Sequence, residues 1–198
     1  MNDTKERILR TALSLFAKKG YEAVSVSEIA GAQGMTKGAL YKHYANKRDI
    51  FDSILHRMEQ RDAERAQAYS LPEGVPEEME EKYAASELDD MLAYAKAQFR
   101  YWTQDDFAAD FRRMLTLEQF VGAEQSVLYQ QYLASGPVDY MAELFSANGI
   151  ADAERAAVEF YAPMFLMYSV YDTADDKAAV LQILDSCLDS AAKRLNKQ

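Results

Sequence analysis

The sequence is poor in residues that interrupt helices and in residues that build covalent or metal-bound frameworks. Its 198 residues include 4 prolines, 8 glycines, 1 cysteine and 2 histidines. A single cysteine excludes an internal disulfide, and neither histidine lies in a spacing typical of a nucleophile or a metal site. No apolar run approaches the length of a membrane-spanning helix, and the polar N-terminus does not resemble a signal peptide. We therefore expect a cytoplasmic protein that has no cofactor and no metal and does not contact a membrane.

The abundant residues favour an all-α fold. Hydrophobic residues make up 49% and charged residues 27%, which is ordinary for a globular protein. Alanine, leucine, glutamate and methionine, which have high helix propensity, are frequent. Apolar residues recur at helical spacing along most of the chain, and we expect about nine helices.

Charge is divided unevenly along the chain, whose net charge is −10. Residues 1–60 contain ten basic and seven acidic side chains, whereas the remaining 138 residues contain twelve and twenty-five. A mildly basic N-terminal segment beside a strongly acidic remainder fits DNA contact confined to one end. The acidity of the remainder is equally explained by solubility.

The stretch from Ser25 to Lys47, SVSEIAGAQGMTKGALYKHYANK, predicts two short helices joined by a tight turn. Ser25 and Glu28 have the spacing of a capping box, Gly34 can adopt the positive φ of a sharp turn, and Thr36 can cap the second helix. A helix from residue 37 to residue 44 would bury Leu40 and Tyr44 and would expose Lys37, Gly38, Tyr41, Lys42 and His43. This arrangement is how a chain offers one helix to the major groove of DNA.

These residues resemble the N-terminal signature of the TetR family of bacterial transcriptional regulators. The resemblance covers about the first quarter of the chain and rests on Gly20-Tyr21, Ala23, Ser25, Glu28-Ile29-Ala30, the run from Thr36 to Tyr41, His43-Tyr44, Asn46-Lys47 and Ile50-Phe51. It implies a three-helix DNA-binding domain over residues 1–46 and a larger helical ligand-binding and dimerisation domain over 47–198. A break rich in proline, Ser70 to Pro76, lies within the second of these and is followed by an acidic run that we interpret as a solvated helix start or linker.

The resemblance and the chemistry of the side chains together predict the DNA contacts. Hydroxyl groups at helix N-termini can donate to a phosphate. A glycine within a helix, as at Gly38, suggests close approach to the DNA backbone, and the alternative is that this glycine serves packing or capping. The expected contacts are Ser25, Thr36, Lys37, Gly38, Tyr41, Lys42, His43 and Lys47.

Aromatic and methionine side chains of the second domain are candidates for a ligand cavity, because a pocket needs aromatic walls and a few polar groups. The alternative is that they form ordinary core. We select Phe99, Trp102, Phe111, Met114, Tyr161 and Phe165.

The last predicted helix, residues 176–195, has the most regular apolar stripe. In a TetR-like protein the last two long helices of each subunit pair into a four-helix bundle, although such a stripe can also pack only within its own chain. The resemblance therefore implies a homodimer formed through Ile183, Leu184, Cys187, Leu188 and Ala191.

Three functions remain open on the sequence. The first is a homodimeric repressor that binds a two-fold symmetric operator in double-stranded DNA and is released by a small-molecule inducer. The second is a DNA-binding regulator without such a ligand, whose C-terminal domain docks a protein partner. The third, a helical enzyme with a vestigial DNA-binding segment, has little support, because no catalytic constellation is recognisable.

Overall fold

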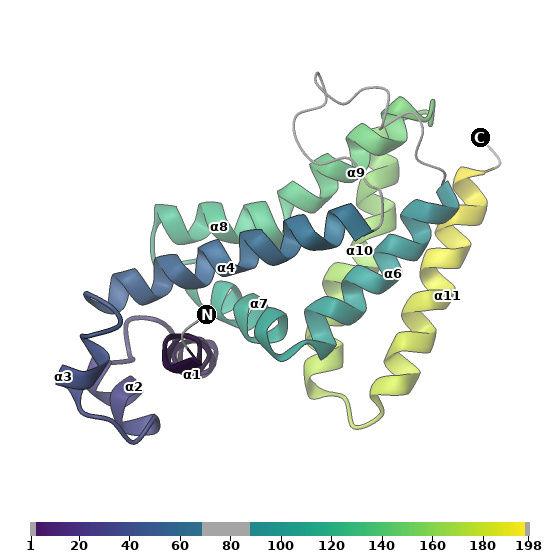
Figure 1. The fold of residues 1–198 in the computed structure, drawn as a ribbon. Helices are drawn as coiled ribbons and strands as arrows, with labels where there is room; N and C mark the ends of the chain where they lie inside the picture. Colours follow the sequence, from purple (N-terminus) through teal and green to yellow (C-terminus); the bar gives the residue numbers. More distant parts are fainter. Residues whose placement is uncertain (1–2, 69–87, 197–198) are drawn as a thin grey trace. The chain divides into compact units, whose positions relative to one another are not determined.

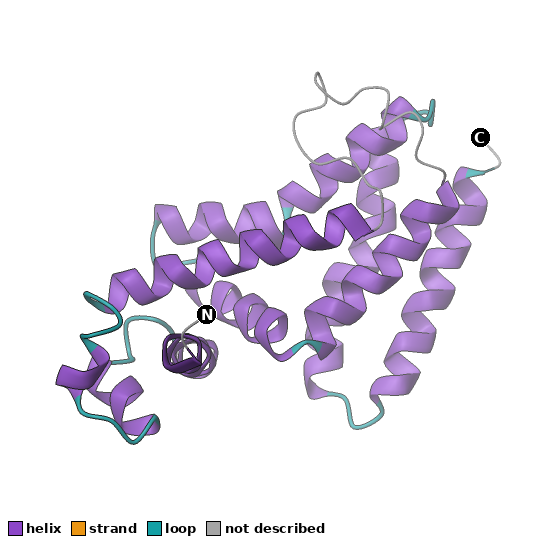
Figure 2. Cartoon of the chain, in the orientation of Figure 1, coloured by secondary structure: helices purple, strands orange, loops and turns teal. Residues whose placement is uncertain are grey.

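The computed structural model describes residues 3–68 and 88–196, and over these ranges the chain forms helices joined by loops, with no strand. Figure 2 shows this all-α composition, which confirms the predicted fold class. The predicted break from Ser70 to Pro76 and the acidic run after it lie outside the described residues. The helices are α1 (Asp3–Lys19), α2 (Val26–Ala32), α3 (Lys37–Leu40), α4 (Lys47–Ala68), α6 (Leu88–Gln104), α7 (Asp106–Glu118), α8 (Ala123–Leu133), α9 (Ser135–Ala147), α10 (Ala153–Thr173) and α11 (Lys177–Leu195).

Several helix starts are fixed by local capping, as the sequence predicts. Ser25 Oγ accepts the Glu28 amide at 3.1 Å, and Thr36 Oγ1 accepts the amide three residues further on at 3.2 Å. Asn46 and Asp176 make the same contact at the starts of α4 and α11. Each such bond gives a side-chain acceptor to an amide in the first turn of the helix, where the i−4 carbonyl of a preceding helical turn is absent.

Two local predictions were wrong. The spacing of Thr103 and Asp106 in the sequence predicts that these two residues cap α7, but Asp105 is the N-cap and accepts the amide three residues ahead at 3.0 Å. The Thr103 hydroxyl instead donates to the carbonyl of Phe99 within α6, at 2.7 Å. The helix expected from residue 37 to 44 ends at Leu40 and continues as turns.

The described residues group into two compact units. Of the described residues, the first unit contains 3–62 and 105–129, and the second contains 63–68, 88–104 and 130–196. This grouping reflects compactness of the backbone, so the functional boundary expected near residue 46 stays a prediction.

The core of the first unit joins α1 to α7. Ile8, Ala12 and Phe16 of α1 are fully buried, and α1 packs against α7, which buries Phe111 and Met114 (Figure 1). Burial of such apolar side chains is the main source of folding free energy, at roughly 25 cal/mol per Å².

The second unit is built on α10, which packs against α9, α11 and α6 (Figure 1). Phe99 of α6 is fully buried and stacks on Tyr168 of α10, with ring centroids 5.0 Å apart. Two ion pairs join α6 to α11, Lys96 with Asp189 at 2.5 Å and Arg100 with Asp185 at 2.6 Å.

Candidate nucleic-acid interface

The α2–α3 pair of the first unit is the candidate interface. The turn between the helices contains Gly34, whose φ of +64° lies in the left-handed region that favours glycine. On the inner side, Ile29, Leu40 and Tyr44 are at most 2% exposed. This buried side fixes how α3 is oriented against its own core.

The opposite side of this pair is polar and accessible. Thr36, Lys37, Gly38 and Lys42 are exposed, Tyr41 is 43% exposed, and the side chain of His43 is half-buried. The Lys37 ammonium lies 5.6 Å from the centroid of the Tyr41 ring. The structure therefore gathers six of the eight predicted contact residues, His43 included, at the N-cap of α3, on α3 and just after it.

Gly38 is not required by packing within this chain. A Cβ built at this position would meet no atom nearer than Thr36 Oγ1, at 4.0 Å, and φ does not lie in the left-handed region. The packing alternative for Gly38 thus has no support, while an approaching DNA backbone would still need the space. Its role as a contact stays a prediction.

Tyr44 anchors the end of this segment to α1. Its hydroxyl donates to the carbonyl of Lys5 at 3.1 Å, and the ring is 2% exposed. Burial raises the pKa of Tyr44 to about 12, and the nearby carboxylates of Glu6 and Asp49 add to the effect. Tyr44 therefore remains a neutral hydrogen-bond donor at physiological pH.

Lys47 is placed differently from the other predicted contacts. Its ammonium donates to the carbonyl of Tyr21 at 2.8 Å and more weakly to that of Glu22 at 3.4 Å, and lies 4.1 Å from the centroid of the Tyr21 ring. The side chain is 21% exposed. Much of the hydrogen-bonding capacity of Lys47 is thus directed at the loop between α1 and α2.

Some basic side chains of the first unit are held in ion pairs with acidic ones. Lys19 pairs with Glu28 at 2.5 Å, and the hydrogen bond from Lys19 holds the pKa of Glu28 below its ordinary value. Arg48 makes a two-bond pair with Glu124 at 2.9 and 2.5 Å, which lowers the pKa of Glu124. Among the described residues, Lys37 and Lys42 have no acidic partner.

Arg61 forms a second two-bond pair, at the start of α7. Its guanidinium donates to both carboxylate oxygens of Asp105, at 2.9 and 2.7 Å. Burial acts to raise the pKa of Asp105, but the hydrogen bonds from Arg61 and from the Ala108 amide outweigh it, so the pKa lies below its ordinary value. The charged form of Asp105 thus both caps α7 and binds α4.

The six residues predicted to bind a ligand are divided between the units. Phe111 and Met114 are fully buried in the first unit, whereas the other four lie in the second. There Trp102 is 4% exposed, the Tyr161 hydroxyl donates to the carbonyl of Leu133 at 2.9 Å, and Phe165 is 45% exposed. Their role as pocket walls stays a prediction.

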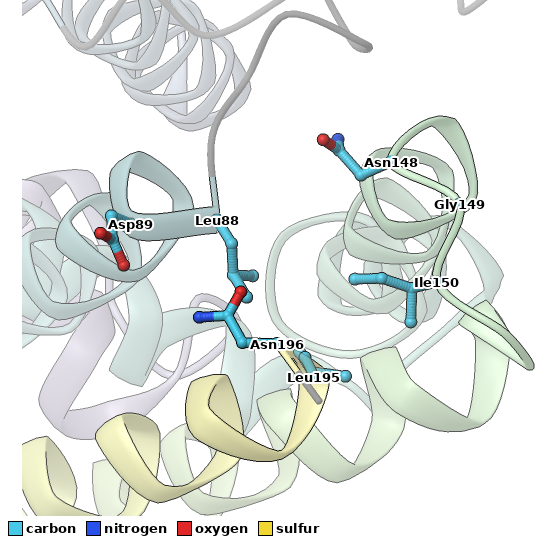
Figure 3. A pocket seen from close by; sticks show the side chains of 7 residues that line it. All are labelled: Leu88, Asp89, Asn148, Gly149, Ile150, Leu195 and Asn196. Atoms are coloured by element: carbon cyan, nitrogen blue, oxygen red, sulfur yellow. The ribbon is translucent and has the colours of Figure 1, made fainter. Parts of the chain in front are cut away.

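An open pocket of about 460 Å³ lies in the second unit (Figure 3). The start of α6 and the end of α11 line one side, and the turn after α9 lines the other. Its volume falls in the range of small-molecule sites. However, no aromatic side chain and none of the six predicted ligand residues is among its lining residues, which are Leu88, Asp89, Asn148, Gly149, Ile150, Leu195 and Asn196.

The residues predicted to form a dimer are only partly accessible. Leu184, Leu188 and Ala191 are at most 5% exposed within their own chain, whereas Ile183 is 51% exposed and Cys187 is half-buried. Helix α10 also presents an exposed apolar stripe, formed by Val158, Phe165, Leu166 and Val170. None of these residues was predicted to form the dimer, and Phe165 was predicted to bind a ligand. The sequence signal was available, because α10 is apolar around most of its circumference, and such a helix is covered on more than one side.

Two further observations concern the described residues alone. No helix in ranges 3–68 and 88–196 has the length and apolarity needed to cross a membrane. In the same ranges, no three His, Cys, Asp or Glu side chains are grouped so that they could hold a metal ion.

Comparison with known proteins gives matches at two scales. Residues 8–54 match the model of the bacterial regulatory proteins of the tetR family. The transcriptional regulator YerO of Bacillus subtilis is 51% identical over 47 residues, and AcrR of Shigella flexneri is 44% identical over 52 residues. These segments cover 24% and 26% of this chain but only 16% and 24% of the two relatives. The chain is thus matched to about a quarter or less of their length.

At the level of the whole fold, the structure of the fatty acid degradation regulator FadR from Bacillus halodurans is similar, with a TM-score of 0.61. The match covers 97% of this chain and 96% of that one, at 18% sequence identity. At this identity the similarity establishes the fold alone.

Proposed function

We propose that this chain, whose residues 8–54 match the TetR family model, is a DNA-binding regulator of transcription rather than an enzyme. The observation that supports this most directly is the α2–α3 pair. It buries Leu40 and Tyr44 on one side and exposes Lys37, Tyr41 and Lys42 on the other. Helix α3 would enter the major groove, with the hydroxyls of the caps and the exposed lysines at phosphates.

Within this proposal the eight predicted residues have different tasks. Lys37 and Lys42 meet phosphates or guanine edges, Gly38 lets the DNA backbone approach, and Tyr41 packs on a sugar or a thymine methyl. Ser25, Thr36 and His43 contact phosphates. Lys47 acts mainly by holding the α1–α2 loop, and its third N–H is available to a phosphate.

The regulator would act as a homodimer on a two-fold symmetric operator, because two α3 helices one helical turn apart can read two half-sites. The exposed apolar stripe of α10, beside Ile183 of α11, is the surface that we propose the two copies share. Covering it would remove apolar area from water, which is the usual driving force of stable dimers.

We further propose that the protein represses its target genes in the cytoplasm and that a small molecule bound in the C-terminal domain relieves repression. The ligand would favour a spacing of the two DNA-binding segments that no longer fits two half-sites. The second candidate function is that the C-terminal domain docks a protein partner instead of a small molecule. A thermal shift assay combined with operator binding distinguishes the two, because a small inducer raises the melting temperature of the purified protein and lowers its operator affinity.

The test of DNA binding is footprinting of the purified protein on the intergenic DNA upstream of its own gene, over a series of salt concentrations. We expect protection of a two-fold symmetric site. Lys42→Ala should weaken binding and reduce the slope of log affinity against log salt by about 0.9 for one lost phosphate contact. Lys193→Ala is the matched control, because Lys193 is exposed on α11 and its substitution changes net charge equally.

Weak binding without sequence preference, unchanged by Lys42→Ala and by Tyr41→Ala, would contradict the proposed function. A slope that falls equally for Lys42→Ala and Lys193→Ala would show that net charge, rather than a contact from α3, sets the affinity.

A further inference from the structure

One residue of the loop between α1 and α2 is held from two helices. The Tyr21 amide donates to Glu118 Oε1 of α7 at 2.7 Å, and the Tyr21 carbonyl accepts from Lys47 of α4 at 2.8 Å. The Tyr21 ring packs edge-on against Phe16 and Phe51, with centroids 5.2 and 5.1 Å away. Tyr21 is therefore fixed through its amide, its carbonyl and its ring.

Glu118 is an unusual partner for this amide. It lies at the last position of α7 and is 4% exposed, and its second oxygen, Oε2, is buried without a hydrogen-bond partner in the described residues. Burying a polar atom without a partner opposes folding. An apolar side chain would avoid this opposition, so the stability of α7 does not explain a glutamate here. The one contact that does need an oxygen is the Tyr21 amide.

The backbone beside Tyr21 is shaped to admit this carboxyl group. Gly20 has a φ of +82°, and a Cβ built on it would lie 2.9 Å from Glu118 Oε1. A side chain at position 20 would thus be strained and would also displace the Glu118 oxygen. The absence of a side chain at Gly20 thus leaves room for the Glu118 carboxylate next to the Tyr21 amide.

We propose that Glu118 is a positioning residue for DNA binding, which acts by fixing the α1–α2 loop through the Tyr21 amide. This inference rests on the function proposed above. The loop leads within a few residues to Ser25, the N-cap of α2, and α2 packs on α3. Fixing the loop therefore orders the proposed DNA-binding segment in the free protein. A segment that is already ordered loses less conformational entropy when it binds DNA, so its affinity is higher.

Two conservative variants separate the hydrogen bond from the charge. Glu118→Gln keeps the length of the side chain and an oxygen that can accept the Tyr21 amide, but removes the negative charge. Glu118→Asp keeps the charge but is shorter by one methylene group and does not reach. If Glu118 acts by positioning, the Gln variant retains operator affinity and the Asp variant loses it. If it acts only as a negative charge, the Asp variant behaves as wild type.

The experiment measures operator affinity and melting temperature for wild type, both variants and Glu124→Gln. Glu124 is the matched control, since it is a carboxylate of the same unit whose pair with Arg48 is exposed. We expect Glu118→Asp to lose about tenfold in affinity, the scale of one hydrogen bond, and Glu118→Gln and Glu124→Gln to stay within about threefold of wild type. Equal affinities for all four proteins would overturn the inference.

Hydrogen exchange at the Tyr21 amide tests the hydrogen bond between Tyr21 and Glu118 without DNA. Exchange should be slow in wild type and Glu118→Gln and faster in Glu118→Asp, and similar rates in all three would overturn the inference. Failure of wild type to bind any specific site, with the Tyr21 amide protected as expected, would contradict the proposed function and leave the hydrogen bond established as a structural feature. The two failures are thus distinguishable.

Discussion

Replacing Lys47 by methionine should destabilise the protein although the residue lies on the candidate DNA-binding surface. Methionine keeps an unbranched apolar stem on the Tyr21 ring and removes only the ammonium. The lost interactions are the 2.8 Å bond to the Tyr21 carbonyl and the cation–π contact at 4.1 Å. The ion pair with Glu22, at 3.9 Å on a side chain that is 75% exposed, contributes little.

A hydrogen bond from a charged donor contributes about 1.5–3 kcal/mol and a partly desolvated cation–π contact about 0.5–2 kcal/mol. Water can still reach the Tyr21 carbonyl in part, so we take the low end of both ranges and expect a loss of about 2 kcal/mol. For a chain of this size that corresponds to a fall in melting temperature of roughly 4–8 °C.

The assay is thermal and urea unfolding followed by circular dichroism, without DNA. Lys42→Met is the matched control, because Lys42 is exposed and its substitution should change stability by less than about 0.5 kcal/mol. If Lys47→Met and Lys42→Met melt together, the assignment of the Lys47 ammonium to the α1–α2 loop is refuted, and Lys47 becomes a candidate for direct phosphate contact alone.

Three further outcomes are expected. Gly20→Ala should lower the free energy of unfolding, measured by chemical denaturation, by about 1–2 kcal/mol, because alanine is strained in the left-handed backbone conformation. The close contact with Glu118 adds to this loss. An unchanged free energy of unfolding would contradict the φ of +82°. The folded-state pKa of Asp105 is depressed, so its stabilising contribution is present above the unfolded pKa of about 3.9 and is lost as pH falls through the folded pKa. Asp105→Asn should therefore flatten the acid limb of the stability curve, whereas an unchanged acid limb would mean that the pair with Arg61 contributes nothing. Leu166→Glu, at a position that is 62% exposed, should convert a dimer to a monomer in sedimentation without loss of helical signal, and a variant that stays dimeric would place the interface elsewhere.

Local chemistry explains what the sequence predicted well. The caps at Ser25 and Thr36 depend on bonds that span three residues. Leu40 and Tyr44 are four residues apart, and although α3 ends at Leu40, the Tyr44 amide still donates to the Leu40 carbonyl, so both side chains are buried. Such features are determined within a few residues, so a sequence pattern contains them.

Other features could not be predicted from the sequence, because they depend on neighbouring residues that suit the same role or on contacts between residues far apart in the chain. Thr103 and Asp105 both suit a helix start, and the observed cap, Asp105, also binds Arg61, which is 44 residues away in the sequence. The Glu118–Tyr21 bond spans 97 residues, so no local pattern contains it. Which apolar side of α10 is exposed likewise depends on what α6, α9 and α11 cover.

The cap of α3 separates folding from recognition. Thr36 closes the helix with a lone pair of its hydroxyl oxygen, and a hydroxyl that accepts in this way still has a proton to give. Aspartate caps a helix equally well but has no proton to offer and has a negative charge. Within the proposed function, Thr36→Asp would leave the fold intact and make the site repel an anion. The hydroxyl proton of Thr36 thus distinguishes a residue that only caps the helix from one that can also donate a hydrogen bond to a phosphate.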